Sequence, residues 1–189
     1  MANIYPFYPV KLVIGILISD YEYKNKLEQD LINEFGKIDY ESELLDFTYS
    51  SYYNREMGTS IKKYFLSFNE LRPPDTMVDI KLITNKIETK YSRNSCRKIN
   101  LDPGYLFLSK FILTTTKDGS HRIPLHSGIY AEITLMYEKN SFRPVEWTYP
   151  DFKDIRYISI LNSIRKTYKI QLTLLNSSNS GHFKKVNNG

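Results

Sequence analysis

Polar side chains that could do chemistry are concentrated between residues 98 and 132. Asp102, His121 and Glu132 can exchange protons, and they are the candidate catalytic residues. Arginine offers a planar fork to phosphate or carboxylate, lysine a point charge, and an aromatic ring a stacking face. Groups of these kinds, with one amide and a tryptophan further on, are the candidate ligand-binding residues: Lys98, Asn100, Lys117, Arg122, Tyr130 and Trp147.

The length of one loop decides which of these side chains meet. Tyr130 and Glu132 share one face of a predicted strand at 129–138, which a loop at 126–128 joins to a predicted strand at 121–125. A three-residue loop places Arg122 opposite Glu132 and gives a salt bridge. A two-residue loop places His121 there instead and gives an oriented histidine that titrates near neutral pH. In either register, one cation is expected to stay free.

The same residues also have purely structural interpretations. Asp102 followed by Pro103 is typical of a helix N-cap with proline in the first turn. The opposed charges of Arg122 and Glu132 are typical of a structural cross-strand pair. Trp147 is more typical of a buried anchor for the last helix than of an aromatic lid. The density of such groups within about 30 residues is what favours a site.

Motifs of several common enzyme classes are missing from the sequence. It contains no GxxxxGK[ST], GxGxxG, HExxH or GxSxG. Asn85-Lys86-Ile87-Glu88 differs from a guanine-reading NKxD in its last residue, and it lies within a predicted helix with no phosphate loop before it. The single cysteine excludes a zinc site built on several cysteines, and no metal site is specified. No cofactor is indicated.

Composition places the chain among globular proteins. It has 189 residues with 41% hydrophobic and 25% charged residues, enough for a core without a disulfide or metal. The longest aliphatic run, Leu12 to Ile18, is too short to span a bilayer, and no leader precedes it, so a cytoplasmic location is expected. The net charge of +5 is unevenly distributed, with more acidic than basic residues in the first fifty. This asymmetry could steer an anionic ligand.

The first hundred residues alternate in a pattern that predicts the elements around the candidate site. A buried strand at 11–19 precedes a helix that Ser19 and Glu22 begin as a capping box and Gly36 ends. Strands at 45–50 and 61–68 form a hairpin, and a helix from Pro73 to Tyr91 leads to a strand at 97–101. That helix has an apolar stripe, and its opposite face carries Lys81, Asn85 and Glu88. The order β-α-β-β-α-β predicts a ferredoxin-like α+β core.

A C-terminal extension follows this core. The apolar segment from Tyr105 to Leu113 is expected to be a buried helix, followed by the hairpin of 121–125 and 129–138. Asp151 is expected to cap a terminal helix. We expect one domain over residues 1–175 and a disordered tail over 176–189. No subunit interface is located by the sequence, so the oligomeric state is left open.

Six short stretches together resemble a known family. They are Asn100 to Tyr105, Thr116 to Ile123, Gly128 to Glu132, Glu56 to Gly58, Ile80 to Asn85, and Trp147 to Asp151. In order and spacing, over roughly residues 10–172, the chain resembles the uncharacterised prokaryotic family catalogued as domain of unknown function 4416. Some members carry a "GTP-binding" label, and this sequence has no phosphate loop that would support it. The resemblance implies no particular reaction.

Three functions follow as hypotheses. The first is binding of an anionic small ligand, a nucleotide or phosphorylated metabolite, by Lys98, Lys117, His121 and Arg122 beside Tyr130 or Trp147. The second is hydrolysis or phosphoryl transfer with His121 or Glu132 as general base and Asp102 as its partner. The third, less favoured, is single-stranded RNA binding on the sheet face, for which the ribonucleoprotein motifs are missing. A membrane partner is not expected.

Overall fold

Strand β1 (Val10–Ile18) is the centre of the structure, and all nine of its residues are buried. In the computed structural model, which describes residues 3–93 and 96–178, β1 pairs antiparallel with β4 on one side and with β7 on the other. Its aliphatic side chains are covered on both faces of the sheet, which is why the strand shows no polar alternation. The buried strand predicted at 11–19 is confirmed to within one residue at each end.

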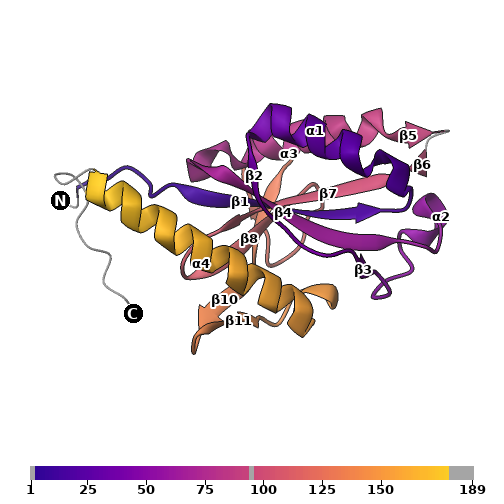
Figure 1. Ribbon diagram of the computed structural model, residues 1–189. Coiled ribbons are helices and arrows are strands. Elements are labelled where there is room, and N and C mark those ends of the chain that lie inside the picture. The colour runs from indigo at the N-terminus through magenta and orange to yellow at the C-terminus, as the bar shows by residue number, and fades with distance from the viewer. Residues whose placement is uncertain (1–2, 94–95, 179–189) are drawn as a thin grey trace.

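The helices and strands form a mixed α+β fold with antiparallel pairing throughout the main sheet (Figure 1). After β1 the elements are, in chain order, η1 (Tyr21–Tyr23), α1 (Lys24–Phe35), β2 (Ile38–Glu41), β3 (Leu45–Asp46), α2 (Asn54–Met57), β4 (Lys62–Arg72), η2 (Pro74–Thr76), α3 (Met77–Lys90), β5 (Ser92–Arg93), β6 (Cys96–Arg97), β7 (Ile99–Leu106), β8 (Lys110–Thr115), β9 (Ile123–Pro124), β10 (Tyr130–Glu138), β11 (Ser141–Pro144), η3 (Asp151–Lys153) and α4 (Ile155–Ser178). Of the helices in this described part, none combines the length and apolarity needed to cross a bilayer.

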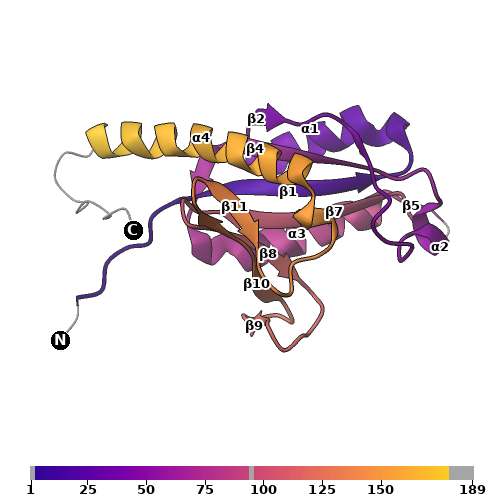
Figure 2. The ribbon, with the colours of Figure 1, turned by 90° about the horizontal axis from the view of Figure 1, so that it is seen from below.

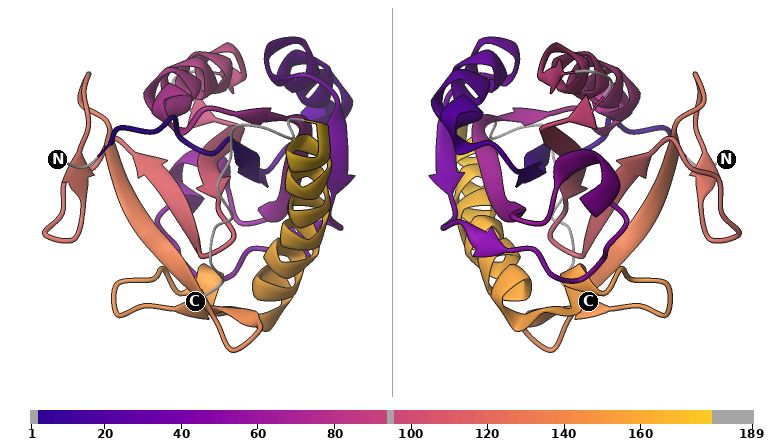
Figure 3. Two further views of the ribbon diagram at one scale, coloured as in Figure 1. Left: turned by 90° about the vertical axis from the view of Figure 1, so that its left-hand side faces the viewer. Right: turned by 90° about the vertical axis from the view of Figure 1, so that its right-hand side faces the viewer.

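The sheet has the strand order β11-β10-β8-β7-β1-β4-β2, with β3 added beside β4 and β9 beside β10. Helix α1 lies in the connection from β1 to β2, and α3 lies in the connection from β4 to β7. Each connection passes one intervening strand, so both are crossover connections. The two helices lie side by side on one face of the sheet (Figure 3). Helix α4 packs on the other face, so strands β1, β4 and β7 are covered from both sides.

Two apolar clusters hold these layers together. The first joins alternate residues of β1, such as Leu12 and Ile14, to α1 and α3. The second joins Val13 and Phe65 on the opposite face to α4 and to strands β8, β10 and β11. Because successive strand residues point to opposite faces, one run of aliphatic residues serves both clusters.

The prediction of a buried helix from Tyr105 to Leu113 is wrong. This segment is the end of β7, a turn and most of β8, with Tyr105 paired to Ile112. Asp102 is accordingly no helix N-cap: it lies within β7 opposite Gly15. Pro103 lacks an N–H but is tolerated in the strand because β7 is not paired with β8 before Gly104; its carbonyl accepts the Thr114 hydroxyl at 2.9 Å. An apolar run covered on both faces looks the same whether it is helix or strand.

Three smaller predictions also need correction. The edge strand next to β4 is mainly β2 (Ile38–Glu41), and the predicted strand at 45–50 contributes only β3. Asp20, not Ser19, accepts a backbone N–H at the start of the first helical turn, from Glu22 at 3.3 Å. Asp151 does not cap the last helix, because Asp154 accepts the Arg156 N–H at 2.7 Å.

Other parts of the C-terminal extension are confirmed. Leu125 and Ile129 close a three-residue loop, and the β9–β10 hairpin projects from the body of the molecule (Figure 2). Helix α4 is the predicted terminal helix and runs to Ser178. The remainder of the predicted tail, residues 179–189, lies outside the described residues.

Candidate functional site

The sheet divides where β7 and β8 separate. The two strands pair only between Gly104–Leu106 and Phe111–Leu113. Beyond Leu113, β8 is paired with β10 alone. A cavity of about 720 Å³ lies at this division, which we call the fork. Its walls come from β7, β8, β10, the loop before α2, one face of α3 and the segment 149–152. The size is that of a small-molecule site.

Helix α3 satisfies the open edge of β7 at the fork. Leu101 donates its N–H to Glu88 Oε1 at 2.7 Å, and its carbonyl accepts Lys81 Nζ at 3.0 Å. Glu88 and Lys81 are both buried, and with Asn85 they form a polar stripe of α3 along the cavity. Sequence reasoning placed these three residues on the face away from the core and did not propose them as site residues. Their i, i+4, i+7 spacing was the available signal.

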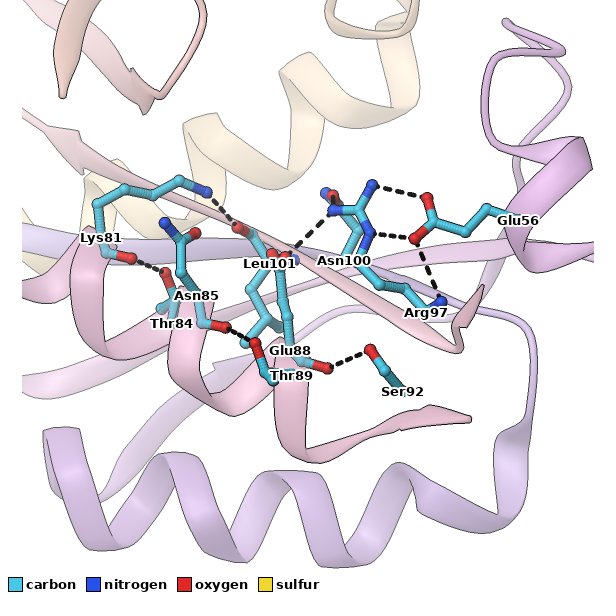
Figure 4. Close-up of polar contacts among 10 residues, drawn as sticks. All are labelled: Glu56, Lys81, Thr84, Asn85, Glu88, Thr89, Ser92, Arg97, Asn100 and Leu101. Carbon is cyan, nitrogen blue, oxygen red and sulfur yellow. Dashed lines mark hydrogen bonds and ion pairs between the residues drawn. The ribbon is translucent and has the colours of Figure 1, made fainter. Parts of the chain in front are cut away.

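Arg97 connects this stripe to the neighbouring strand and to α2. Its guanidinium donates two bonds to Glu56, at 2.7 and 2.9 Å, and one to Glu88 Oε2 at 3.1 Å. It also donates to Asn100 Oδ1 at 2.9 Å. Figure 4 shows Arg97 between Glu56 on one side and Asn100 and Glu88 on the other. Since Oδ1 faces Arg97, the Asn100 amide nitrogen is turned the other way.

Several cavity-lining groups have unused hydrogen-bonding capacity. Among the described residues, Asn100 Nδ2 has no hydrogen-bond partner although it is buried, and the same is true of Glu132 Oε1 on strand β10. Asp102 is half-buried, and its carboxylate makes no hydrogen bond or ion pair with the described residues. Lys81 is 6% exposed, and within the described residues the only hydrogen bond of its ammonium group is the one to the Leu101 carbonyl. Buried polar atoms are nearly always paired with protein, ligand or ordered water, so these groups are candidate ligand contacts.

Burial changes the acidity of the groups around the fork. Burial raises the pKa of Glu88, against the opposing charge of Lys81 and the hydrogen bond from Leu101. The pKa of Tyr53 rises through burial and the nearby charge of Asp102, and the pKa of Tyr149 rises through burial and the charge of Glu132. The hydroxyls of both tyrosines therefore stay protonated and can donate.

His121 and Arg122 converge on one carboxylate oxygen. Tyr130 pairs with Pro124 and Ala131 with Ile123, so Arg122 lies opposite Glu132, as the three-residue loop predicts. Arg122 Nε donates to Glu132 Oε2 at 2.7 Å, and His121 Nε2 lies 3.2 Å from the same atom. The expectation that one cation stays free is therefore wrong. Both side chains fix the position of Glu132 through its Oε2, and neither of them lines the cavity.

The other predicted site residues divide between the cavity and its surroundings. Asn100, Asp102, Lys117 and Glu132 line the cavity, whereas Lys98 and Tyr130 do not. Trp147 is also outside: it stacks on His121 at 5.4 Å between ring centroids and donates to the Ile133 carbonyl. It is 41% exposed, so the fully buried anchor is wrong as well.

A buried ion pair forms a further wall that sequence reasoning missed. Lys63 Nζ lies 2.5 Å from Asp151 Oδ2 and 4.4 Å from the centroid of the Phe152 ring. Both charged side chains are buried and line the cavity. Lys63 packs against the backbone of Gly15, where a Cβ would lie 3.3 Å from Phe65 Cε1 and 3.4 Å from Lys63 Cε. The two residues are 88 positions apart, so no local pattern connects them.

Tyrosines and one lysine form the mouth of the cavity. Lys117 Nζ lies 4.1 Å from the centroid of the Tyr52 ring, and Tyr52 packs edge-on against Tyr53 at 5.1 Å. Tyr149 faces them from the segment before η3 and accepts a bond from Arg122 at 2.5 Å. Such rings offer flat apolar surfaces with polar rims to a ligand.

The cavity carries both signs of charge. Lys63, Lys81, Arg97 and Lys117 balance four acidic residues, Glu88, Asp102, Glu132 and Asp151. Lys81 and Lys117 are the two of these cations without an ion pair to any described residue. Within the described ranges, no three His, Cys, Asp or Glu side chains are grouped as a metal site.

One comparison with known proteins gave a match. A family described as domain of unknown function (DUF4416) matches residues 8–168, which include every residue of the cavity wall. No curated protein and no solved structure matched.

Proposed function

The chain belongs to the family described as domain of unknown function (DUF4416), and from its cavity we propose that it binds an anionic small ligand, a nucleotide or phosphorylated metabolite, at the fork between β7 and β8. The cavity is large enough for such a ligand, and its lining combines aromatic faces with a few convergent polar groups. Both properties are typical of small-molecule sites.

The observation that carries this proposal is the ammonium group of Lys81. It is buried, lines the cavity, and lacks an ion pair in the part of the chain that the structure describes. An ammonium group removed from water is costly unless an anion compensates it. Both oxygens of Glu88 already accept bonds, from Leu101 and Arg97. An anionic ligand at the fork would supply the missing charge.

Two further groups support an anion at the same place. Asn100 Nδ2 is a buried donor that no described residue partners, and Arg97 fixes the amide that carries it. Lys117 stands at the mouth above Tyr52, where it can meet an incoming anion before burial. The ligand-binding role predicted for Asn100 and Lys117 is kept in this proposal. The roles predicted for His121 and Arg122 are reduced to positioning Glu132.

Binding to a panel of nucleotides, sugar phosphates, inorganic phosphate and pyrophosphate tests the proposal. We expect at least one phosphorylated compound to raise the melting temperature, because a ligand at 100 times its Kd adds about 2.7 kcal/mol of stability. Lys81→Met should lower affinity at least tenfold, since a charged hydrogen bond is lost. Lys86→Met is the matched control, as Lys86 is an exposed lysine of the same helix.

A flat response of the wild-type protein across the panel in calorimetry would contradict anion binding. Equal losses in Lys81→Met and Lys86→Met would contradict the placement at the fork.

A hydrolytic or phosphoryl-transfer activity is a second proposal. Glu132 favours it, because its side chain lines the cavity and its buried Oε1 has no partner among the described residues, so this oxygen could accept a proton from water or a ligand hydroxyl. His121 would act through Glu132, whose other oxygen it contacts. Turnover of a bound phosphate ester that survives both Glu132→Gln and His121→Ala would eliminate this activity.

We also propose that residues 10–106 form a ferredoxin-like unit. The strand order β7-β1-β4-β2, the antiparallel pairing and the two crossover helices on one face support this assignment.

RNA binding on the sheet is given little support, because α1, α3 and α4 cover the central strands. The free thiol of Cys96 agrees with a cytoplasmic location.

A further inference from the structure

We infer that the ligand carries hydroxyl groups as well as its anionic group, and that vicinal hydroxyls of a phosphorylated sugar bind Asp102. This inference rests on the proposed function, because it concerns the second end of the same ligand. Lys81 and Asn100 provide donors for the anion. Asp102 and Glu132 provide acceptors, which an anion alone would leave unused and would be repelled by.

The buried acceptor is Glu132 Oε1. The Glu132 side chain is 1% exposed and belongs to the cavity wall, yet this oxygen lacks a partner among the described residues. Its other oxygen is held by Arg122 and His121, so the carboxylate cannot turn away. A fixed acceptor in a dry wall selects a ligand that brings an O–H or N–H donor to it.

The second acceptor is Asp102, which offers both carboxylate oxygens. It lies on β7 two residues after Asn100, so the two side chains share one face of the strand. A carboxylate with two free oxygens accepts two neighbouring hydroxyls at once, as adjacent oxygens of a sugar ring require. Tyr53 and Tyr149 stand close enough for the charge of Asp102 to affect their acidity, and they provide faces and hydroxyls beside the ring.

The separation of the acceptors favours hydroxyls over an ammonium group. Strand β8 lies between β7 and β10 in the sheet order and is not paired with β7 at Asp102, so Asp102 and Glu132 are at least two strand spacings apart, about 10 Å or more. A single ammonium cannot contact both. Hydroxyls or N–H groups distributed along one skeleton can, while a phosphate at one end meets Lys81.

The vicinal hydroxyls could belong to a free sugar phosphate or to the ribose of a nucleotide. Calorimetric titration of the full chain separates these sources with four ligands: ribose 5-phosphate, 2-deoxyribose 5-phosphate, adenosine 5′-monophosphate and its 2′-deoxy analogue. Inorganic phosphate reports on the anion alone. The variant is Asp102→Asn, and Asp79→Asn is the control, an exposed aspartate of α3 outside the cavity.

We expect removal of the 2-hydroxyl to weaken binding roughly tenfold to a hundredfold, as for a lost hydrogen bond to a charged group. Asp102→Asn should lower affinity for the ribose compounds to a similar degree and leave inorganic phosphate unaffected. Tighter binding of the nucleotide than of ribose 5-phosphate identifies a nucleotide site; the reverse identifies a sugar phosphate site.

Two negative results have different meanings. If the wild-type protein binds none of the phosphates, the proposed function fails and this inference fails with it. If it binds them but treats each deoxy analogue like its parent, the inference is overturned and anion binding stands. The ligand-side comparison needs no variant, so a folding defect in Asp102→Asn cannot obscure it.

Discussion

The buried ammonium group of Lys81 supports the proposed anion site, and its burial carries a stability cost. It is buried with a single hydrogen bond to a carbonyl. Methionine would fill a similar volume without a charge to desolvate. We expect Lys81→Met to raise the free energy of unfolding of the ligand-free protein by about 1–2 kcal/mol in urea titrations. A decrease would mean that the bond to Leu101 outweighs the buried charge.

Single residues also show what the sequence could predict about the site. The pairing of Arg122 with Glu132 follows from alternation and loop length, and it is confirmed. The arrival of His121 at the same oxygen depends on the twist of the hairpin, which alternation does not describe. Lys81 and Glu88 escaped prediction because charged residues on a helix are normally exposed, and only the open edge of β7 explains their burial.

Among the elements, the fork depends on how closely β7 and β8 approach where they still pair. Gly104 lies at this point, and a Cβ there would be 2.6 Å from the Ile112 carbonyl oxygen and 2.8 Å from Phe111. Backbone cannot yield as a side chain can, so we expect Gly104→Ala to cost about 1–3 kcal/mol of unfolding free energy. In Gly15→Ala, the new methyl would meet only side chains at 3.3 Å or more, so it is the milder control. Equal costs would show that the close approach is unimportant.

The start of α4 makes the fold sensitive to acid. Hydrogen bonds from Arg156, and one from Tyr49, hold the pKa of Asp154 far below its ordinary value despite some burial. An aspartate with a lowered pKa stabilises the folded state above about pH 4 and loses that contribution as the pH falls further. Asp154→Asn keeps a capping side chain without the charge. We therefore expect it to flatten the decline in stability below pH 4 in unfolding titrations; an unchanged decline would contradict this.

For the whole molecule, the ion pair of Lys63 and Asp151 joins β4 to the C-terminal segment at the wall of the cavity. Asp151→Asn leaves a buried ammonium uncompensated, and we expect it to cost about 3–5 kcal/mol of unfolding free energy. A double variant that carries Lys63→Met and Asp151→Leu should recover most of that loss, because neither residue then buries a charge. A double variant as unstable as the single one would show that packing, not charge, is responsible.

At this scale the sequence predicted the central strand, the two crossover helices, the late hairpin and the terminal helix. It did not predict that residues 105–113 extend the sheet, because their apolar character is the same for a buried helix and for a strand covered on both faces. That one error hid the fork, since a helix there would leave β7 as the last strand. The residues of the cavity were visible in the sequence, but their meeting place was not.

The way α3 meets Leu101 has a consequence for strand pairing with other chains. A sheet that divides has inner edges as well as outer ones, and exposed strand edges invite other chains to pair with them. At Leu101, both backbone groups are already taken by Glu88 and Lys81. An extended peptide adding a strand there would have to displace a carboxylate and an ammonium together. At this point of β7, the divided sheet therefore offers no free backbone pair to an added strand.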